Sequence, residues 1–167
     1  TYTQFGYAWH GAHFDGLLAR AVFPRSLVRA QLVTFVGLCA IPFALLGPLV
    51  AGVRPQSLAP LGSLLLYNVG VTAPMLLGLG VWARTPLQLS QSTFFNYQGT
   101  STYHFLAVVP VMGFPVGLVV GVGLSKTLLI VAGLGTLGLL AVPLWTRGLG
   151  RLLRGQRHAM ATGFRDE

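Results

Sequence analysis

Long apolar runs alternate with short polar links along the chain, and a polar, aromatic stretch without charged side chains, 87–104, divides them into two pairs. The runs predict transmembrane helices at about 32–53, 58–81, 105–124 and 127–145. Each run is close to the ~20 apolar residues that a helix needs to cross a bilayer core. Because short links join the runs within each pair, the pattern predicts an all-α membrane protein with four transmembrane helices in two antiparallel hairpins.

Polar side chains are rare inside these runs, and the second run holds most of them. Tyr67, Asn68 and Thr72 lie within one and a half helical turns of each other. Because an amide is costly in hydrocarbon, Asn68 is expected to face another helix or a polar cavity. An interhelical hydrogen bond is the favoured interpretation, and direct contact with a substrate is the alternative. Pro42 and Pro48 are expected to kink the first run, with neighbouring helices satisfying the freed carbonyls.

Glycines in the last two runs predict close helix packing. The third run holds Pro110 and Pro115, followed by Gly117 and Gly121, whose GxxxG spacing allows another helix to approach closely. The fourth run contains GxGxxG at 133–138. This motif indicates a dinucleotide site only between a strand and a helix of a βαβ unit. In an apolar run it predicts small-residue packing instead.

The segments outside the runs, 1–31, 82–104 and 147–167, are expected to lie at the membrane surface or in the cytoplasm. In the first of them a helical spacing of apolar residues predicts a short amphipathic helix, formed by Phe14, Leu17, Leu18 and Ala21 and ended by Pro24. A new helix is expected to begin near Ser26, and a tight turn is expected at Ser125 and Lys126. The segment 147–167 reads as a basic cytoplasmic tail, either an anchor to anionic lipid or a signal for topology.

Composition and charge assign the chain to the membrane and orient it. Of 167 residues, 53% are hydrophobic and 8% are charged, whereas soluble domains carry roughly 25% charged residues. The net charge of +8 comes from residues that flank the apolar runs, which disfavours a nucleic-acid surface. Nine of the eleven basic residues fall on one predicted side and only Arg54 and Lys126 on the other. The positive-inside rule therefore predicts that both ends and the central loop are cytoplasmic.

Candidate catalytic chemistry is scarce. His10, His13 and Asp15 could be imagined as metal ligands, but zinc sites use three or four ligands on rigid elements, so no metal is expected. Three acidic residues in all leave almost no room for paired-carboxylate catalysis. Cys39 stands alone in an apolar run, which excludes a disulfide framework within the chain. No cofactor motif is present, so none is expected. The first residue is Thr1 and no signal peptide follows it, so the chain is expected to be part of a longer polytopic protein.

Five short segments carry a family resemblance, at 13–20, 66–70, 95–101, 103–106 and 163–165. In order and spacing they resemble the C-terminal part of an uncharacterised bacterial family of polytopic membrane proteins, which is itself similar to the permease subunits of ABC-2-type transporters. The resemblance implies a short cytoplasmic helix that docks on an ATPase subunit, formed by Phe14, Asp15, Gly16, Leu17 and Leu18. It agrees with the amphipathic helix inferred from spacing.

The function expected from this resemblance is that of a multi-pass permease subunit of an exporter in the bacterial inner membrane. The chain would lie in the lipid bilayer, alone or as an oligomer, and would not be an enzyme, because its ATPase partner would hydrolyse ATP. An alternative is a scaffold without transport that docks a partner through the central loop, at Asn96, Tyr97, Gln98 and Gly99, with His104 at the membrane edge. A third hypothesis, an intramembrane enzyme, would need His104 or His13 as a base.

Overall fold

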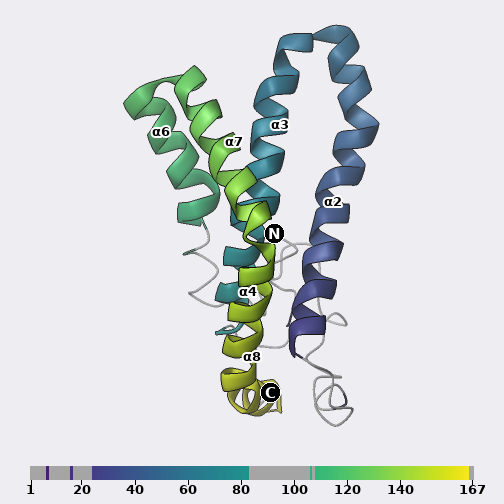
Figure 1. The fold of residues 1–167 in the computed structure, drawn as a ribbon, viewed down its shortest axis with the longest axis vertical. Coiled ribbons are helices and arrows are strands. Elements are labelled where there is room, and N and C mark those ends of the chain that lie inside the picture. Colours follow the sequence, from purple (N-terminus) through teal and green to yellow (C-terminus); the bar gives the residue numbers. More distant parts are fainter. Residues whose placement is uncertain (1–6, 8–15, 17–23, 83–105, 107, 166–167) are drawn as a thin grey trace. The chain divides into compact units, whose positions relative to one another are not determined.

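The computed structural model describes residues 7, 16, 24–82, 106 and 108–165. Every regular element within these residues is helical (Figure 1). The described part of the chain is therefore all-α, as the hydrophobic pattern predicts.

The first long helix, α2, runs from Pro24 to Val53. Proline is well placed at a helix start, because the N–H it lacks would have no intrahelical partner there. Pro42 and Pro48 lie inside the helix, which continues as a single element through both. After α2 a 3-10 turn, η3 (Pro55–Ser57), reverses the chain, as the short link predicts. Backbone hydrogen bonds from Arg54 to Val50 (2.8 Å) and from Ser57 to Arg54 (2.9 Å) hold this reversal.

The return passage has three parts. An α-helix, α3 (Leu58–Tyr67), leads into a π-helical segment, η4 (Asn68–Thr72), and α4 (Ala73–Gly80) completes it. These bounds agree with the predicted helix at 58–81. The change of helix type in the middle was not evident from the apolar run.

The next described passage also begins with a π-helical segment, η5 (Val109–Gly113), which continues into α6 (Phe114–Val122). The turn after α6 is at Gly123, where φ is 82°, a conformation that favours glycine. The tight turn predicted at Ser125 and Lys126 therefore lies slightly earlier, because α7 (Leu124–Leu140) already includes both residues. Thr127 fixes the start of α7 by donating from its N–H (3.1 Å) and its hydroxyl (2.8 Å) to the Gly123 carbonyl.

The predicted helix at 127–145 is interrupted. Ala141 ends α7 with φ of −82° and ψ of 3°, and α8 (Val142–Arg165) begins directly after it. Pro143 lies in the first turn of α8, where its missing N–H is tolerated. The segment interpreted as a basic tail is helical as far as Arg165.

Two helices in the described part of the chain are long and apolar enough to cross a membrane, Pro24–Val53 and Pro55–Gly80. A third candidate exists if α7 and α8 form one broken span, and Val109–Val122 is a shorter apolar helix. The apolar helices are compatible with membrane insertion. The arrangement of four spans in two hairpins stays a prediction, as does the amphipathic helix near residue 14.

The chain forms two compact units. One, called here the α3–α7 unit, comprises Leu32–Pro74 and Val108–Trp145. The other, the α8 unit, comprises Thr1–Gln31, Met75–Ala107 and Thr146–Glu167.

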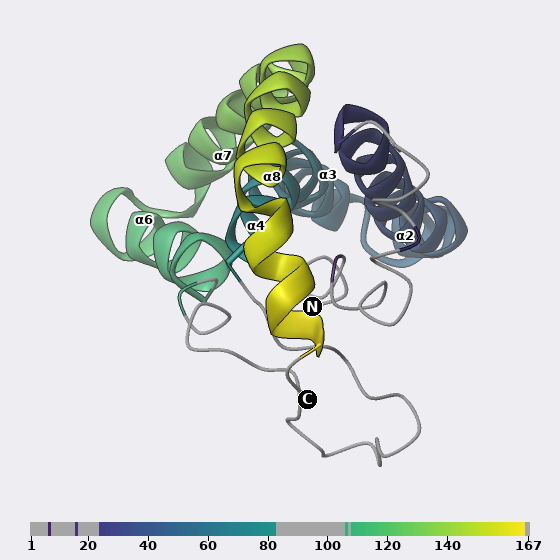
Figure 2. The same ribbon diagram turned by 90° about the horizontal axis from the view of Figure 1, so that it is seen from below.

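Within the α3–α7 unit, α7 packs against α3 on one side and α6 on the other, an order visible in two perpendicular views (Figures 1 and 2). The turn at η3 and the turn at Gly123 lie at the same end of this unit (Figure 1). Val131 of α7 and Tyr67 of α3 are almost fully buried.

The α8 unit has an apolar core from three helices. Val28 of α2, Leu77 and Val81 around the end of α4, and Met160 of α8 are all fully buried. Tyr7 is also buried, which raises the pKa of its phenol, because desolvation disfavours the charged form.

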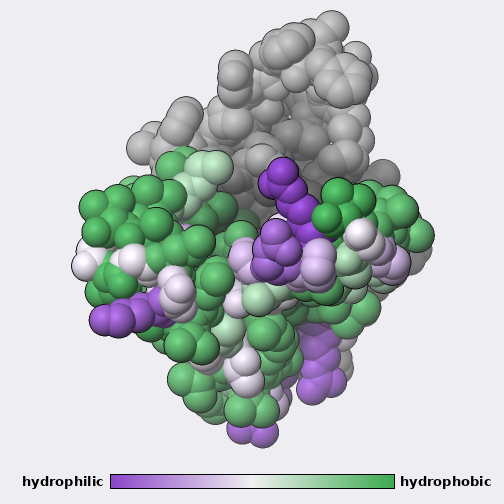
Figure 3. All heavy atoms as spheres, turned by 90° about the horizontal axis from the view of Figure 1, so that it is seen from above, coloured by the Kyte–Doolittle hydropathy of each residue, from purple (hydrophilic) through white to green (hydrophobic). Residues whose placement is uncertain are grey.

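Large apolar side chains cover much of the described surface. Along α2 they recur every fourth residue over more than three turns and form one exposed stripe, made of Ile41, Leu45, Leu49 and Val53. Figure 3 shows hydrophobic residues over most of the described atoms on one face of the molecule. In water such a stripe would be a liability, whereas lipid tails solvate it favourably.

Candidate functional site

The candidate site is the pair of π-helical segments in the α3–α7 unit. In each segment the closing hydrogen bond spans five residues, from the Ala73 N–H to the Asn68 carbonyl and from the Phe114 N–H to the Val109 carbonyl. The residue after each closing donor is a proline, Pro74 or Pro115. A proline ring clashes with the carbonyl four residues earlier, and widening the preceding turn relieves that clash. Two prolines thus account for two π-helical segments.

Proline also leaves one carbonyl of η5 without an intrahelical donor. The Pro110 carbonyl would be paired with the N–H of residue 115 in a π-helix, but that residue is a proline, and the Phe114 N–H is bonded to Val109. The hydroxyl of Tyr67 donates to this carbonyl over 2.8 Å. Because an unpaired carbonyl is expensive in an apolar environment, this bond stabilises the widened turn.

Tyr67 joins the two segments by a ring contact as well. It is the last residue of α3, directly before η4, and only 3% of its surface is exposed. Its ring lies nearly parallel to that of Phe114, with centroids 6.1 Å apart and 16° between the planes. Aromatic pairs in such offset arrangements add stability beyond their buried area. Tyr67, at the end of α3, thus contacts both Pro110 of η5 and Phe114, the first residue of α6.

Glycines bring α7 into backbone contact with α3 and η4. A Cβ atom added at Gly135 would overlap the backbone of Leu66 and Tyr67, and one added at Gly70 would overlap the Gly135 carbonyl. Gly138 lies equally close to the Gly70 carbonyl, whose α-helical donor would have been the missing N–H of Pro74. The small-residue packing predicted for 133–138 is confirmed at these two positions of α7.

Other glycines in the same region have open space around them. A Cβ atom at Gly133, Gly117 or Gly121 would meet no atom of a neighbouring element within 4 Å. The close approach predicted for the GxxxG pair is thus not made by any described part of this chain.

Asn68 and Thr72 place polar groups on the π-helical segment η4, one turn apart. Thr72 is 2% exposed, and among the described residues its hydroxyl has no hydrogen-bond partner. Asn68 is half-buried, and its side chain makes no hydrogen bond within the described chain. The interhelical bond of this region is made by the adjacent Tyr67. Both groups are neutral, so they can form hydrogen bonds but perform no acid–base chemistry. Asn68 is partly accessible to a ligand, whereas the Thr72 hydroxyl is fully buried.

Thr72→Val tests whether the buried hydroxyl contributes to the fold. Valine keeps the branched shape, and no partner within the described residues would be lost, so the free energy of unfolding should stay the same or rise by up to ~1 kcal/mol. Thr127→Val is the matched control, because its hydroxyl bonds the Gly123 carbonyl at 2.8 Å, and its loss should cost ~1 kcal/mol. Unfolding by SDS titration in mixed micelles measures both. A loss for Thr72→Val as large as the control's would show that the hydroxyl has a structural partner.

Most of the site residues predicted from sequence lie outside the described residues. These are the docking residues Phe14, Asp15, Leu17 and Leu18 and the central-loop residues Asn96, Tyr97, Gln98, Gly99 and His104. Gly16 alone of these is described, as an exposed helical residue. No group of three or more His, Cys, Asp or Glu side chains among the described residues could hold a metal ion.

Sequence reasoning identified Asn68 and Thr72 but not the structural role of Tyr67. The signal that could have found it is the spacing of Pro110 and Pro115. The two prolines are five residues apart, so in a widened turn the carbonyl of Pro110 would accept from the N–H of residue 115, which Pro115 lacks. The Pro110 carbonyl then needs a donor from another helix, and the hydroxyl of Tyr67 supplies it.

Comparison with known proteins gives a family but no characterised relative. A family model described as "Family of unknown function (DUF5687)" matches residues 1–167. No curated protein and no solved structure matches the chain.

Proposed function

The chain belongs to the DUF5687 family, and we propose that it is a membrane-spanning permease subunit of an ABC-2-like exporter, powered by a separate ATPase subunit. The observation that carries the proposal is the hydrogen bond from Tyr67, the residue directly before η4, to the Pro110 carbonyl of η5. Irregular helices at membrane depth are tolerated where neighbours cover them or where they line a path. Transporters place substrate sites at such interrupted helices, and π-helical turns are frequent at functional sites.

The proposed movement uses the two widened turns as hinges. One hydrogen bond joins Tyr67, the last residue of α3, to Pro110 of η5, and one ring contact joins it to Phe114, the first residue of α6. Breaking these two contacts costs little compared with unfolding a helix. The glycine contact of α3 with α7 is rigid by comparison, because backbone meets backbone there. Substrate passage therefore moves η5 and α6, while α3 and α7 stay together. Asn68 and Thr72 supply the hydrogen bonds that a polar part of the substrate needs on the way.

The wider arrangement in this proposal has four spans, in the bacterial inner membrane, with both ends of the chain and the central loop in the cytoplasm. The distribution of basic residues supports this orientation, since Arg54 and Lys126 lie at the two turns of the opposite side. The short helix that contains Phe14, Asp15, Gly16, Leu17 and Leu18 docks on the ATPase. ATP hydrolysis takes place on that partner, and the chain itself performs no catalysis.

Co-purification tests the partner. The tagged full chain, extracted from its native membrane in mild detergent, should bring down an ATPase with a phosphate-binding GxxxxGK[ST] motif. Asp15→Lys and Leu17→Glu should each reduce its yield at least ~10-fold, which corresponds to a loss of ~1.4 kcal/mol in binding. Gln4→Lys changes charge in the same segment outside the docking residues and should have no effect.

Isolation of the chain without any such ATPase would contradict the proposal. If instead Asn96→Ala, Tyr97→Ala or Gln98→Ala released a different protein while no flux changed, the chain would be a scaffold that docks through its central loop.

A further inference from the structure

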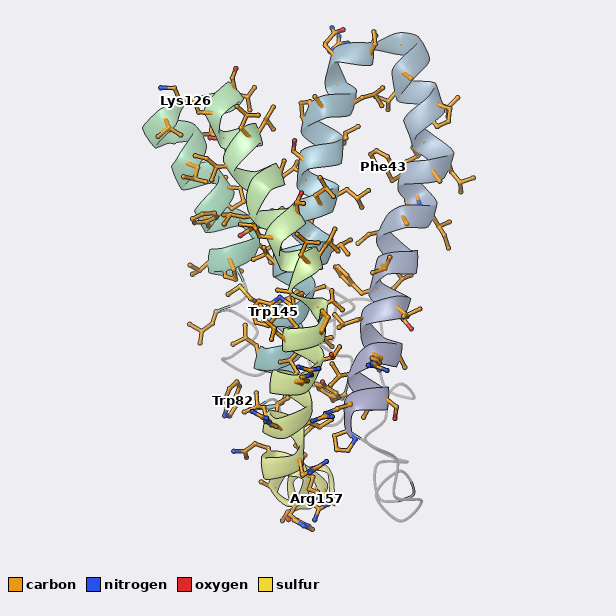
Figure 4. All side chains as sticks on the ribbon, viewed as in Figure 1. Phe43, Trp82, Lys126, Trp145 and Arg157 are labelled. Atoms are coloured by element: carbon orange, nitrogen blue, oxygen red, sulfur yellow. The ribbon has the colours of Figure 1, made fainter. Side chains whose placement is uncertain are left out.

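One face of α8 is strongly basic. Arg147, Arg151 and Arg154 follow one another at helical spacing and are exposed, and His158 extends the row by another turn. The other side of the helix is buried in the core of the α8 unit, through Leu149, Leu153 and Met160. The helix is thus held by its apolar side and presents its basic side outward. Figure 4 shows nitrogen-tipped side chains along α8, with Arg157 labelled.

A second helix adds to this basic face. A Cβ atom built on Gly150 would lie 2.8 Å from Cγ of Arg25 and 3.5 Å from its Cα. The first turn of α2 therefore contacts α8 between Arg147 and Arg151. Arg25 is exposed, as is Arg29 one turn later. We call Arg25, Arg147, Arg151 and Arg154 the basic cluster.

Nothing within the described residues neutralises this cluster. They contain no Asp or Glu, and the whole chain has 3 acidic residues against 11 basic ones. Like charges gathered on one face repel each other, and an anion bound between them offsets that repulsion. The chain's three acidic residues, Asp15, Asp166 and Glu167, lie outside the described residues, and they are too few to balance its 11 basic residues. The excess positive charge favours binding of an anion from another molecule.

The cluster lies where two candidate spans end. A Cβ atom at Gly78 would be 3.4 Å from Cδ2 of Leu149, so the last turns of α4 pack beside α8 at this level. Trp82 follows one turn beyond Gly78 and is 37% exposed, as expected of a tryptophan at the membrane interface (Figure 4). Arg25 lies in the first turn of the other candidate span. Both spans thus place the cluster at the depth of lipid headgroups.

We propose that the basic cluster binds the phosphate groups of anionic phospholipids. Guanidinium groups donate paired hydrogen bonds to phosphate oxygens, and basic groups between helix ends are suited to anionic headgroups. The position at the ends of two apolar spans favours lipid over an acidic protein surface, because a headgroup is always present at that depth. This inference does not depend on the proposed export function.

The test measures lipid preference with the purified full chain. Quenching of tryptophan fluorescence by brominated phosphatidylglycerol, compared with brominated phosphatidylcholine, gives the ratio of their binding constants in mixed micelles. Arg151→Gln combined with Arg154→Gln should lower this ratio roughly 25-fold, or about fivefold for each arginine. The matched control, Arg54→Gln combined with Lys126→Gln, removes the same charge from residues on two separate elements and should lower the ratio clearly less, because these charges do not lie side by side on one helix face.

Two further arms separate the possible sources of the anion. Inorganic phosphate at 10 mM and glycerol phosphate, both added at constant ionic strength, should leave the ratio unchanged if lipid is the ligand. An unchanged ratio in the Arg151→Gln, Arg154→Gln variant would overturn the proposal, as would an equal loss in the control. Competition by free phosphate, or an acidic protein whose co-purification needs the same two arginines, would also overturn it. Equal unfolding midpoints of all variants exclude misfolding as the cause.

Discussion

Gly135→Leu should separate α3 from α7 and lower the free energy of unfolding by ~3 kcal/mol or more, at or above the upper end of the usual range for overpacking. A side chain at this position would overlap the backbone of Leu66 and Tyr67. Unlike a side chain, this backbone cannot relieve the overlap by changing rotamer. The helices could accommodate leucine only by moving apart, which would also break the contact of Gly138 with Gly70. SDS titration in mixed micelles, followed by helical circular dichroism, measures the loss.

Gly133→Leu is the control for this experiment. It lies two residues earlier on the same helix, is exposed, and has no atom of a neighbouring element within 4 Å of an added Cβ. Both substitutions replace glycine by a strong helix former and add the same apolar volume. Gly133→Leu should therefore leave stability unchanged or raise it by ~0.5–1 kcal/mol. Equal stabilities of the two variants would mean that α3 and α7 do not meet at Gly135.

The sequence predicts that α7 packs closely through glycines, but it does not predict which of these glycines make the contact. The run at 133–138 indicates that a helix packs closely through small residues, since glycine in an apolar helix has few other uses. It does not say which of Gly133, Gly135 and Gly138 face the partner, because that depends on the rotation of α7. The partner itself, Gly70, is 65 positions away and has no distinguishing neighbours in sequence.

Hydropathy predicted the helices better than their interruptions. The bounds of the second helix were predicted closely, because the polar turn at η3 and the end of the apolar run are both visible in composition. The break at Ala141 was not predicted, because the residues on both sides are apolar. A hydropathy pattern does not indicate where a helix changes direction. Pro143 was the only local signal, and a proline in a helix's first turn is unremarkable.

The proline pattern explains why the π-helical segments were not foreseen. Proline in an apolar run predicts a disturbed helix, but a kink, a break and a widened turn all relieve the same clash. Pro42 and Pro48 lie within an uninterrupted α2, whereas Pro74 and Pro115 follow π-helical turns. At the turn before Pro115, Tyr67 of a neighbouring helix supplies a donor to the Pro110 carbonyl. Where that donor lies depends on how the helices pack, which the local sequence does not specify.

Tyr67→Phe should therefore lower the free energy of unfolding by about 1–2 kcal/mol, since it removes one hydroxyl and leaves the Pro110 carbonyl unpaired. The ring and its stacking on Phe114 remain. Ser63→Ala is a suitable control, because the Ser63 hydroxyl bonds only the Ala59 carbonyl of its own helix, at 2.8 Å. That carbonyl keeps its place in the helical ladder, so the control should change stability by less than ~0.5 kcal/mol.

The decisive version of this experiment is a double-mutant cycle with Pro115→Ala. Alanine restores an N–H at residue 115, so the Pro110 carbonyl gains a donor within its own helix, whether the turn stays widened or returns to an α-helix. Tyr67→Phe should then cost less than ~0.5 kcal/mol, which gives a coupling energy of about 1 kcal/mol between two residues that lie 48 positions apart. Additive effects would show that the tyrosine hydroxyl does not compensate for the missing N–H.

If the widened turn is a hinge, Pro115→Ala should also slow ATP-driven release from proteoliposomes while it stabilises the fold.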